Sequence, residues 1–162
     1  MSENLRTPPA VDLSMLLNQA GHAVNNRLAR ALAGVGVSVK VYCALKKAVE
    51  GDFTQAQLAE LAWMDKTTMV NVLDEMERDG LAARTMSPTD RRVRLVAITA
   101  KGRDLLVQAD ELVQATYDDI LGTLAVSQRA AFLSALTALV EGPLATPFHM
   151  DEQLARTRRA QR

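Results

Sequence analysis

The chain contains a single cysteine, Cys43, among its 162 residues, so it cannot form a disulfide within one chain. A lone thiol is typical of proteins that reside in a reducing compartment. The first ten residues, MSENLRTPPA, lack the basic start and apolar run of a signal peptide. No apolar stretch approaches the roughly 20 residues that span a bilayer. We therefore expect a cytoplasmic protein with no membrane partner.

The sequence also lacks the patterns that accompany catalysis. Its two histidines, His22 and His149, have no evident catalytic partners, and no group of histidine and cysteine has the spacing of a metal site. Neither a nucleophile elbow nor a phosphate-binding loop is present. We expect a protein that is not an enzyme and that needs no metal or cofactor.

The net charge of the whole chain is zero, because 19 basic residues balance 19 acidic ones. The charges are nevertheless distributed unevenly along the sequence. Segment 84–103 has one acid, Asp90, against six basic residues: Arg84, Arg91, Arg92, Arg94, Lys101 and Arg103. Segment 104–125 has five acids and no lysine or arginine. The balanced total thus conceals a basic ribbon next to an acidic helix, and local charge decides whether a protein binds nucleic acid.

The content of apolar residues, 48%, is enough for one globular domain of this length. Apolar residues recur at helical spacing from Asp12 until Gly34 and Gly36 end the first helix. Ser38 is the expected N-cap of a second helix that ends at Gly51. Further along the chain, Thr99 caps a long helix to about residue 121, and Ser127 begins a last helix that stops at residues 142–143.

Residues 54–95 form the centre of the chain. Thr54 begins a third helix with a capping box to Gln57, and Leu58, Ala59 and Leu61 form its apolar face. Asp65 is the N-cap of a fourth helix that runs to Asp79, where Gly80 supplies a left-handed stop. Segments 81–86 and 93–98 have strand character and flank the turn 87–90. The fold class predicted is mainly α, with a small wing of two or three β-strands.

The fourth helix has one apolar and one polar face. A period of 100° per residue places four side chains on the inner face: Met69, Val72, Leu73 and Met76. Five lie on the outer face: Thr67, Asn71, Asp74, Glu75 and Arg78. Short polar side chains suit a DNA major groove, where an asparagine such as Asn71 can pair with adenine and a valine such as Val70 can contact a thymine methyl. An ordinary solvated helix face is the alternative.

The turn that follows is basic. Arg91 and Arg92 lie at the tip of the hairpin, and arginine suits a narrow, electronegative minor groove. We expect Asp90 to pair with Arg92 and to orient it. The alternative is a solvated charged turn, but a helix pair followed directly by a basic hairpin is a less common combination.

These residues resemble a known family. The motifs are L-A at 58–59, D-K-T-T-M at 65–69, L-D-E-M-E-R-D-G-L at 73–81, S-P-T-D-R-R at 87–92 and I-T-A-K-G at 98–102. Together they resemble the multiple-antibiotic-resistance regulator (MarR) family, most specifically through D-R-R followed by I-T-x-K-G. The resemblance implies a winged helix-turn-helix homodimer that binds a pseudo-palindromic DNA operator. It makes 66–79 the major-groove helix and Arg92 the wing residue in the minor groove.

We accordingly expect a transcriptional regulator, most simply a repressor, that contacts double-stranded DNA through a set of polar, basic and small apolar side chains. These are Thr54, Gln55, Lys66, Thr67, Thr68, Val70, Asn71, Glu75, Arg84, Arg91, Arg92 and Arg94. The chain departs from its relatives at Asn71 and Glu75, where many members carry a basic residue. We therefore expect its own operator preference to depend on these two positions and on Val70.

The whole chain, 1–162, is interpreted as a single domain. We assign 11–34 and 100–142 to dimerisation helices, 38–99 to a DNA-binding lobe and 143–162 to a tail. The expected contacts between the two copies are Leu13, Leu17, Leu133, Leu136 and Val140. A monomeric core that uses the same leucines is the alternative.

The resemblance also implies a small aromatic or phenolic ligand between the dimerisation helices and the lobe. His22 and Trp63 are candidate contacts, with ordinary packing as the alternative for each. Cys43 has apolar neighbours at 41, 44 and 45, which favours an inert core thiol over a peroxide sensor. Two other functions remain open, namely a winged-helix module that binds proteins and a regulator switched by oxidation of Cys43.

Overall fold

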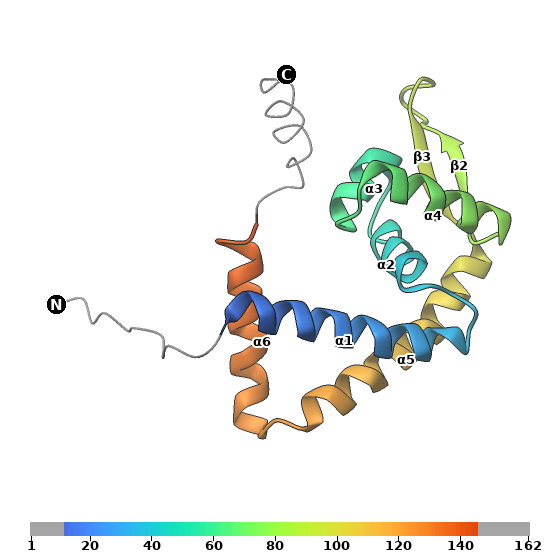
Figure 1. Cartoon of the computed structure of the whole chain (residues 1–162). Helices are drawn as coiled ribbons and strands as arrows, with labels where there is room; N and C mark the ends of the chain where they lie inside the picture. Colours follow the sequence, from blue (N-terminus) through green and yellow to red (C-terminus); the bar gives the residue numbers. More distant parts are fainter. Residues whose placement is uncertain (1–11, 146–162) are drawn as a thin grey trace, which may run out of the picture.

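The computed structural model of the protein describes residues 12–145 (Figure 1). The predicted arm 1–10, His149 and most of the predicted tail lie outside these residues. Six helices and three strands follow one another along the chain: α1 (Leu13–Ala33), α2 (Val39–Ala48), β1 (Phe53–Thr54), α3 (Gln55–Leu61), α4 (Lys66–Arg78), β2 (Ala82–Met86), β3 (Arg94–Ile98), α5 (Ala100–Gly122) and α6 (Val126–Glu141). The mainly α fold with a small β-wing is confirmed.

Side-chain caps fix where most of these helices begin, as the sequence indicates. Ser38 accepts from the amide of Val41, and Asp65 from that of Thr68. Thr54 and Gln57 form the predicted capping box, in which each side chain binds the backbone of the other residue. The last helix differs from expectation, since α6 begins at Val126 rather than Ser127 and its N-cap residue makes no side-chain hydrogen bond.

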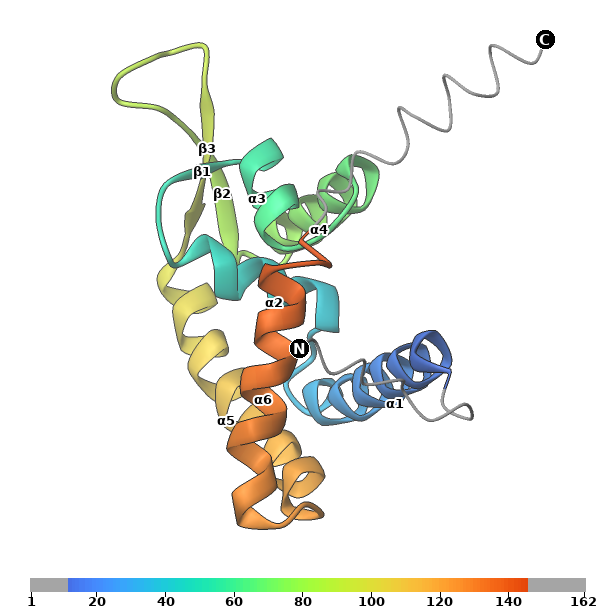
Figure 2. The same ribbon diagram turned by 90° about the vertical axis from the view of Figure 1, so that its left-hand side faces the viewer.

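The wing is a three-stranded antiparallel sheet in the order β1-β3-β2. Strands β2 and β3 pair from Ala82 opposite Ile98 to Met86 opposite Arg94, which agrees with the two predicted strands to within one residue. Strand β1 was not predicted from the sequence, because a strand of two residues is too short to show a periodic pattern. By pairing with β3, β1 ties the start of α3 to the wing, which projects beyond the lobe in Figure 2.

The core lies within the lobe formed by α2, α3, α4 and the wing, together with the adjoining parts of α1 and α5. The predicted inner face of α4 is confirmed, because Met69, Val72, Leu73 and Met76 are all buried. Leu58 and Ala59 of α3 are buried as well, but Leu61 is exposed, so its assignment to the apolar face was wrong. Leu61 is the last residue of α3, a helix of seven residues, and its side chain faces solvent.

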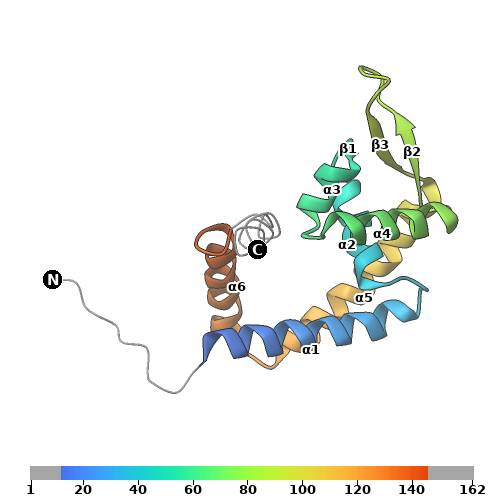
Figure 3. The ribbon, with the colours of Figure 1, turned by 45° about the horizontal axis from the view of Figure 1, so that its top comes forward.

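The outer helices are arranged differently. In Figure 3, α1 and α5 run beneath the lobe and α6 stands apart from it. No residue of α6 is buried, although the helix contains few polar side chains. Among residues 12–145 no single helix is long and apolar enough to cross a bilayer; α5 and α6 pass that test only as a pair, with a bend of 114° between them.

Candidate nucleic-acid interface

The outer face of α4 presents a short polar surface at its start. Lys66, Thr67, Val70 and Asn71 are exposed, and the described residues provide no hydrogen-bonding partner for the polar side chains of this group. Glu75, one turn further on, is half-buried and also makes no ion pair within 12–145. The first two turns of α4 thus carry side chains that can donate, accept and make apolar contact without breaking an interaction in the fold.

Three of the predicted contacts take part in capping or packing instead. The hydroxyl of Thr68 donates to Asp65 Oδ2 at 2.6 Å, and this bond is the main reason that the pKa of Asp65 lies below its usual value. The hydroxyl of Thr54 belongs to its capping box, and the side chain of Gln55 accepts from Arg84 at 3.4 Å. These hydrogen bonds fix the N-termini of α3 and α4, so the three side chains serve the fold.

The tip of the wing carries three exposed arginines, Arg91, Arg92 and Arg94, none of which pairs with an acid among residues 12–145. The loop closes below them through the Ser87 amide, which donates to the Val93 carbonyl at 2.9 Å. Asp90 does orient this tip, but not through the predicted ion pair. Its carboxylate accepts from the backbone amide of Arg92 at 2.9 Å, so it shapes the turn and leaves the Arg92 guanidinium free.

Arg84 differs from the other predicted DNA contacts. It is half-buried on β2, and its guanidinium binds Asp74 at 2.8 Å and Glu77, both on α4. The Glu77 carboxylate also accepts from the backbone amide of Arg84 at 2.8 Å. The hydrogen bond to Asp74, followed by the charge of Glu77, raises the pKa of Arg84. A guanidinium bound in this way is not available to DNA as the sequence suggested.

The I-T-x-K-G motif also acts within the fold. Thr99 donates its hydroxyl to the Gly80 carbonyl at 2.8 Å, and Lys101 donates to the Asp79 carbonyl at 2.7 Å. Gly102 packs so closely that an added Cβ would lie 2.2 Å from the Leu81 carbonyl oxygen. The motif fastens the start of α5 to the end of α4. Arg103 donates to the Ile98 carbonyl at 3.0 Å, so its guanidinium also makes a hydrogen bond within the part of the chain that the structure describes, unlike those of the three arginines at the tip of the wing.

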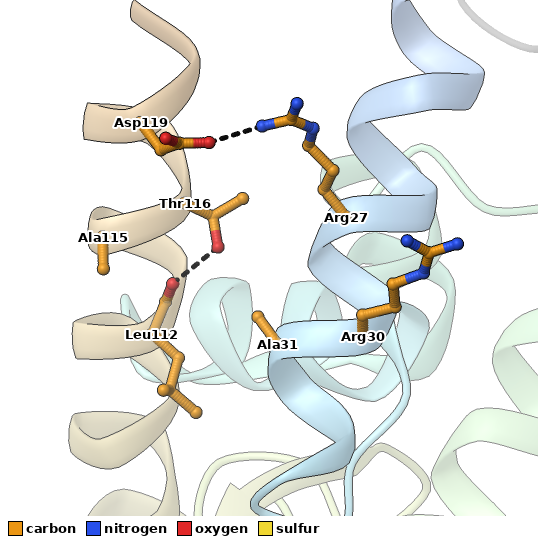
Figure 4. Close-up of a pocket in the computed structure, with 7 residues that line it drawn as sticks. All are labelled: Arg27, Arg30, Ala31, Leu112, Ala115, Thr116 and Asp119. Atoms are coloured by element: carbon orange, nitrogen blue, oxygen red, sulfur yellow. Dashed lines mark hydrogen bonds and ion pairs between the residues drawn. The ribbon is translucent and has the colours of Figure 1, made fainter. Parts of the chain in front are cut away.

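An open groove of about 530 Å³ lies between α1 and α5 (Figure 4). It is lined by Arg27, Arg30, Ala31, Leu112, Ala115, Thr116 and Asp119, so neither His22 nor Trp63 contributes to it. Arg27 crosses the groove and pairs with Asp119 at 2.5 Å. His22 is exposed on α1. Trp63 is also exposed and has a φ of +53°, in the left-handed position that ends α3.

A polar network that the sequence did not suggest joins the lobe to α5. Asp110 of α5 accepts from the Tyr42 hydroxyl at 2.8 Å and from Lys46 at 2.7 Å, both on α2. Neighbouring Cys43 is half-buried, and burial raises the pKa of its thiol. A raised pKa lowers the thiolate fraction at neutral pH, which supports the inert thiol over the peroxide sensor.

Comparison with known proteins agrees with this geometry. Residues 48–93, from the end of α2 to the tip of the wing, match the model of the MarR family. Solved structures extend the likeness to most of the chain. The lobe therefore matches the MarR family model, and the chain as a whole is similar to solved MarR-family regulators.

Three of the solved structures illustrate the likeness. A MarR-family transcriptional regulator from Rhodococcus sp. RHA1 is 27% identical with a TM-score of 0.74, over 83% of this chain and 96% of that one. CouR from Rhodococcus jostii RHA1, bound to p-coumaroyl-CoA, is 28% identical with a TM-score of 0.72, over 83% and 95%. The repressor CouR bound to a 23-mer DNA duplex is 29% identical with a TM-score of 0.73, over 80% and 92%.

The match to the MarR family model and the likeness to solved regulators support a DNA-binding transcriptional regulator. The winged helix-turn-helix fold predicted from the sequence is therefore confirmed by both the architecture and the relatives.

Proposed function

We propose that this protein is a homodimeric repressor that binds a pseudo-palindromic operator and releases it when a small ligand binds. The observation that carries the proposal is the pairing of an unobstructed polar face on α4 with three free arginines on the wing. Lys66, Thr67, Val70, Asn71 and Glu75 would face the major groove. Arg91, Arg92 and Arg94 would follow the backbone into the adjacent minor groove.

The outer helices support pairing of two copies. A helix that is apolar around its circumference is normally buried, yet Leu133 and Val140 of α6 are 46% and 43% exposed. Leu13 and Leu17 on α1 are exposed too, and Leu136 is only half-buried. A second copy that covers these side chains would remove the apolar surface from water. It would also present two α4 helices to half-sites one turn of DNA apart.

Solved structures of a similar protein support the proposal that a ligand releases this protein from DNA. CouR, at 28% identity, has been solved with p-coumaroyl-CoA and also with DNA. We propose an aromatic or phenolic ligand for this protein as well, with His22 and Trp63 as candidate contacts once two copies meet. Binding would favour a dimer in which the α4 helices no longer match the operator spacing.

The first experiment tests the wing. The wild type selects a site from genomic fragments, and its affinity for a fluorescent duplex of that site is measured by anisotropy. Replacing Arg92 with Ala should weaken binding by about tenfold, because one guanidinium leaves the minor groove. Lys47→Ala, which removes one positive charge from α2, is the matched control and should change affinity little. Equal affinities for wild type and the Arg92 variant would refute the wing assignment.

The second experiment tests release. p-Coumaroyl-CoA is titrated into the complex of protein and duplex, with CoA alone as the control. Loss of anisotropy with the aromatic thioester but not with CoA would support an aromatic ligand. An unchanged complex at saturating concentrations would remove this thioester as the effector.

A further inference from the structure

We infer that Arg84 is a positioning residue, which locks the wing to the reading helix α4 through Asp74 and Glu77 so that the two bind DNA as one rigid unit. This inference rests on the proposed DNA-binding function. It assigns a role to two acids that neither the sequence pattern nor the function above uses.

The Arg84 clamp, defined as Arg84 with Asp74 and Glu77, joins two elements that share few other polar contacts. Each carboxylate binds the guanidinium, Asp74 at 2.8 Å, from positions three residues apart on one face of α4. Because a guanidinium presents its donors in a planar fork, it can hold two carboxylates at once, which an ammonium cannot do with fixed geometry. Gln55 of α3 completes the shell at 3.4 Å.

Glu77 has a second role at the edge of the sheet. In the order β1-β3-β2, strand β2 is an edge strand, and its outward amides have no partner strand. The Glu77 carboxylate accepts from the outward amide of Arg84 at 2.8 Å while it also binds the guanidinium. Because Glu77 binds both the backbone and the side chain of Arg84, it fixes the position and the orientation of β2 relative to α4.

The clamp also changes the charge that DNA meets. The second half of α4 carries Asp74, Glu75 and Glu77, which would repel phosphates if all three were unpaired. Arg84 is paired with two of them and leaves Glu75 as the carboxylate of this group that no basic side chain in 12–145 neutralises. A base contact by Glu75 then becomes possible without the repulsion of its neighbours.

The decisive variant removes the carboxylates rather than the arginine. If Arg84 served DNA directly, Asp74→Asn with Glu77→Gln would free it and remove two negative charges, so duplex affinity would rise. The clamp predicts the opposite sign. Affinity should fall about three- to tenfold because the wing must be ordered when it binds. Asp79→Asn is the control, since within residues 12–145 its carboxylate pairs with Arg78 alone, at the end of α4.

Two further measurements separate positioning from loss of stability. Hydroxyl-radical footprinting of the double variant should lose protection in the minor groove under the wing while methylation protection in the major groove remains. Arg84→Lys, which keeps the charge but not the fork, should behave as the double variant does. Equal or higher affinity for the double variant, or wild-type affinity for Arg84→Lys, would overturn the clamp.

Hydrogen exchange in the absence of DNA keeps the clamp testable by itself. Amides of β2 should exchange faster in the double variant than in wild type, while those of the α4 core should not change. Failure of the wild type to bind any duplex would refute the proposed function, and the exchange result would still decide the clamp. Unchanged exchange in β2 would overturn it.

Discussion

The lobe buries its large apolar side chains, whereas α6 exposes them. In the lobe, leucine and methionine side chains are buried by residues of the same chain; Leu73 is 1% exposed and Met76 is 0% exposed. On α6, leucines at similar helical spacing face outward, and none is buried. The lobe thus buries its apolar side chains within one chain, whereas α6 and the first half of α1 leave theirs exposed, and we propose that a second copy covers them.

The largest expected effect is on the free energy of unfolding, and it tests whether the lobe is stable without a second copy. Leu73→Ala should lower the free energy of unfolding by about 2–5 kcal/mol, because a fully buried side chain leaves a cavity. Urea denaturation at several protein concentrations should show the same loss at each. Leu133→Ala on α6 is the matched change, and its effect should instead depend on concentration. A concentration-independent loss for Leu133→Ala would contradict the comparison.

The next effect contrasts two helical glycines. Gly102→Ala should destabilise by at least about 1–3 kcal/mol, since its Cβ meets the Leu81 carbonyl oxygen at 2.2 Å. A Cβ added at Gly21 on α1 meets no atom within 4 Å. Gly21→Ala should therefore stabilise the folded protein by about 0.5–1 kcal/mol, because alanine has the higher helix propensity. Thermal unfolding of both variants checks the signs. A destabilised Gly21 variant would show that a second copy packs against that position.

A change in association should follow from charge on α6. Leu136→Lys would place an ammonium in the proposed contact between copies, so sedimentation equilibrium should shift from a dimer towards the 17.6 kDa chain. Val49→Lys, at a 38% exposed position of the lobe, should leave the mass unchanged. Wild type that sediments as a monomer would remove the need for a second copy.

The smallest expected effect concerns Cys43. Since burial raises the pKa of this thiol, peroxide should alter duplex affinity neither in wild type nor in Cys43→Ser. Anisotropy before and after peroxide checks this. A response present in wild type and absent from the variant would establish a redox switch and reject the inert core thiol.

Prediction from the sequence succeeded where the cause is local. Caps at Thr54, Asp65 and Thr99 act within three residues, so the sequence shows them directly. The inner face of α4 follows from one helical period.

Interactions between elements could not be found in the same way. The pairing of Arg84 with Glu77 crosses the end of a helix and the start of a strand, where no period applies. For that reason Arg84 looked like a DNA contact. The bond from Tyr42 to Asp110 joins residues 68 apart, and strand β1 depends wholly on its partner β3.

We propose above that α4 and the wing bind duplex DNA through free basic side chains. The most direct test of this proposal is the affinity of the wild type for its selected duplex across a series of salt concentrations. We predict a linear fall of log K with log salt, with a slope that corresponds to about 0.9 per phosphate contact in B-DNA. Replacing Arg91, Arg92 and Arg94 together with Ala should make that slope shallower. Binding that is insensitive to salt, or a slope unchanged in the triple variant, would show that these side chains do not contact the phosphates of the duplex.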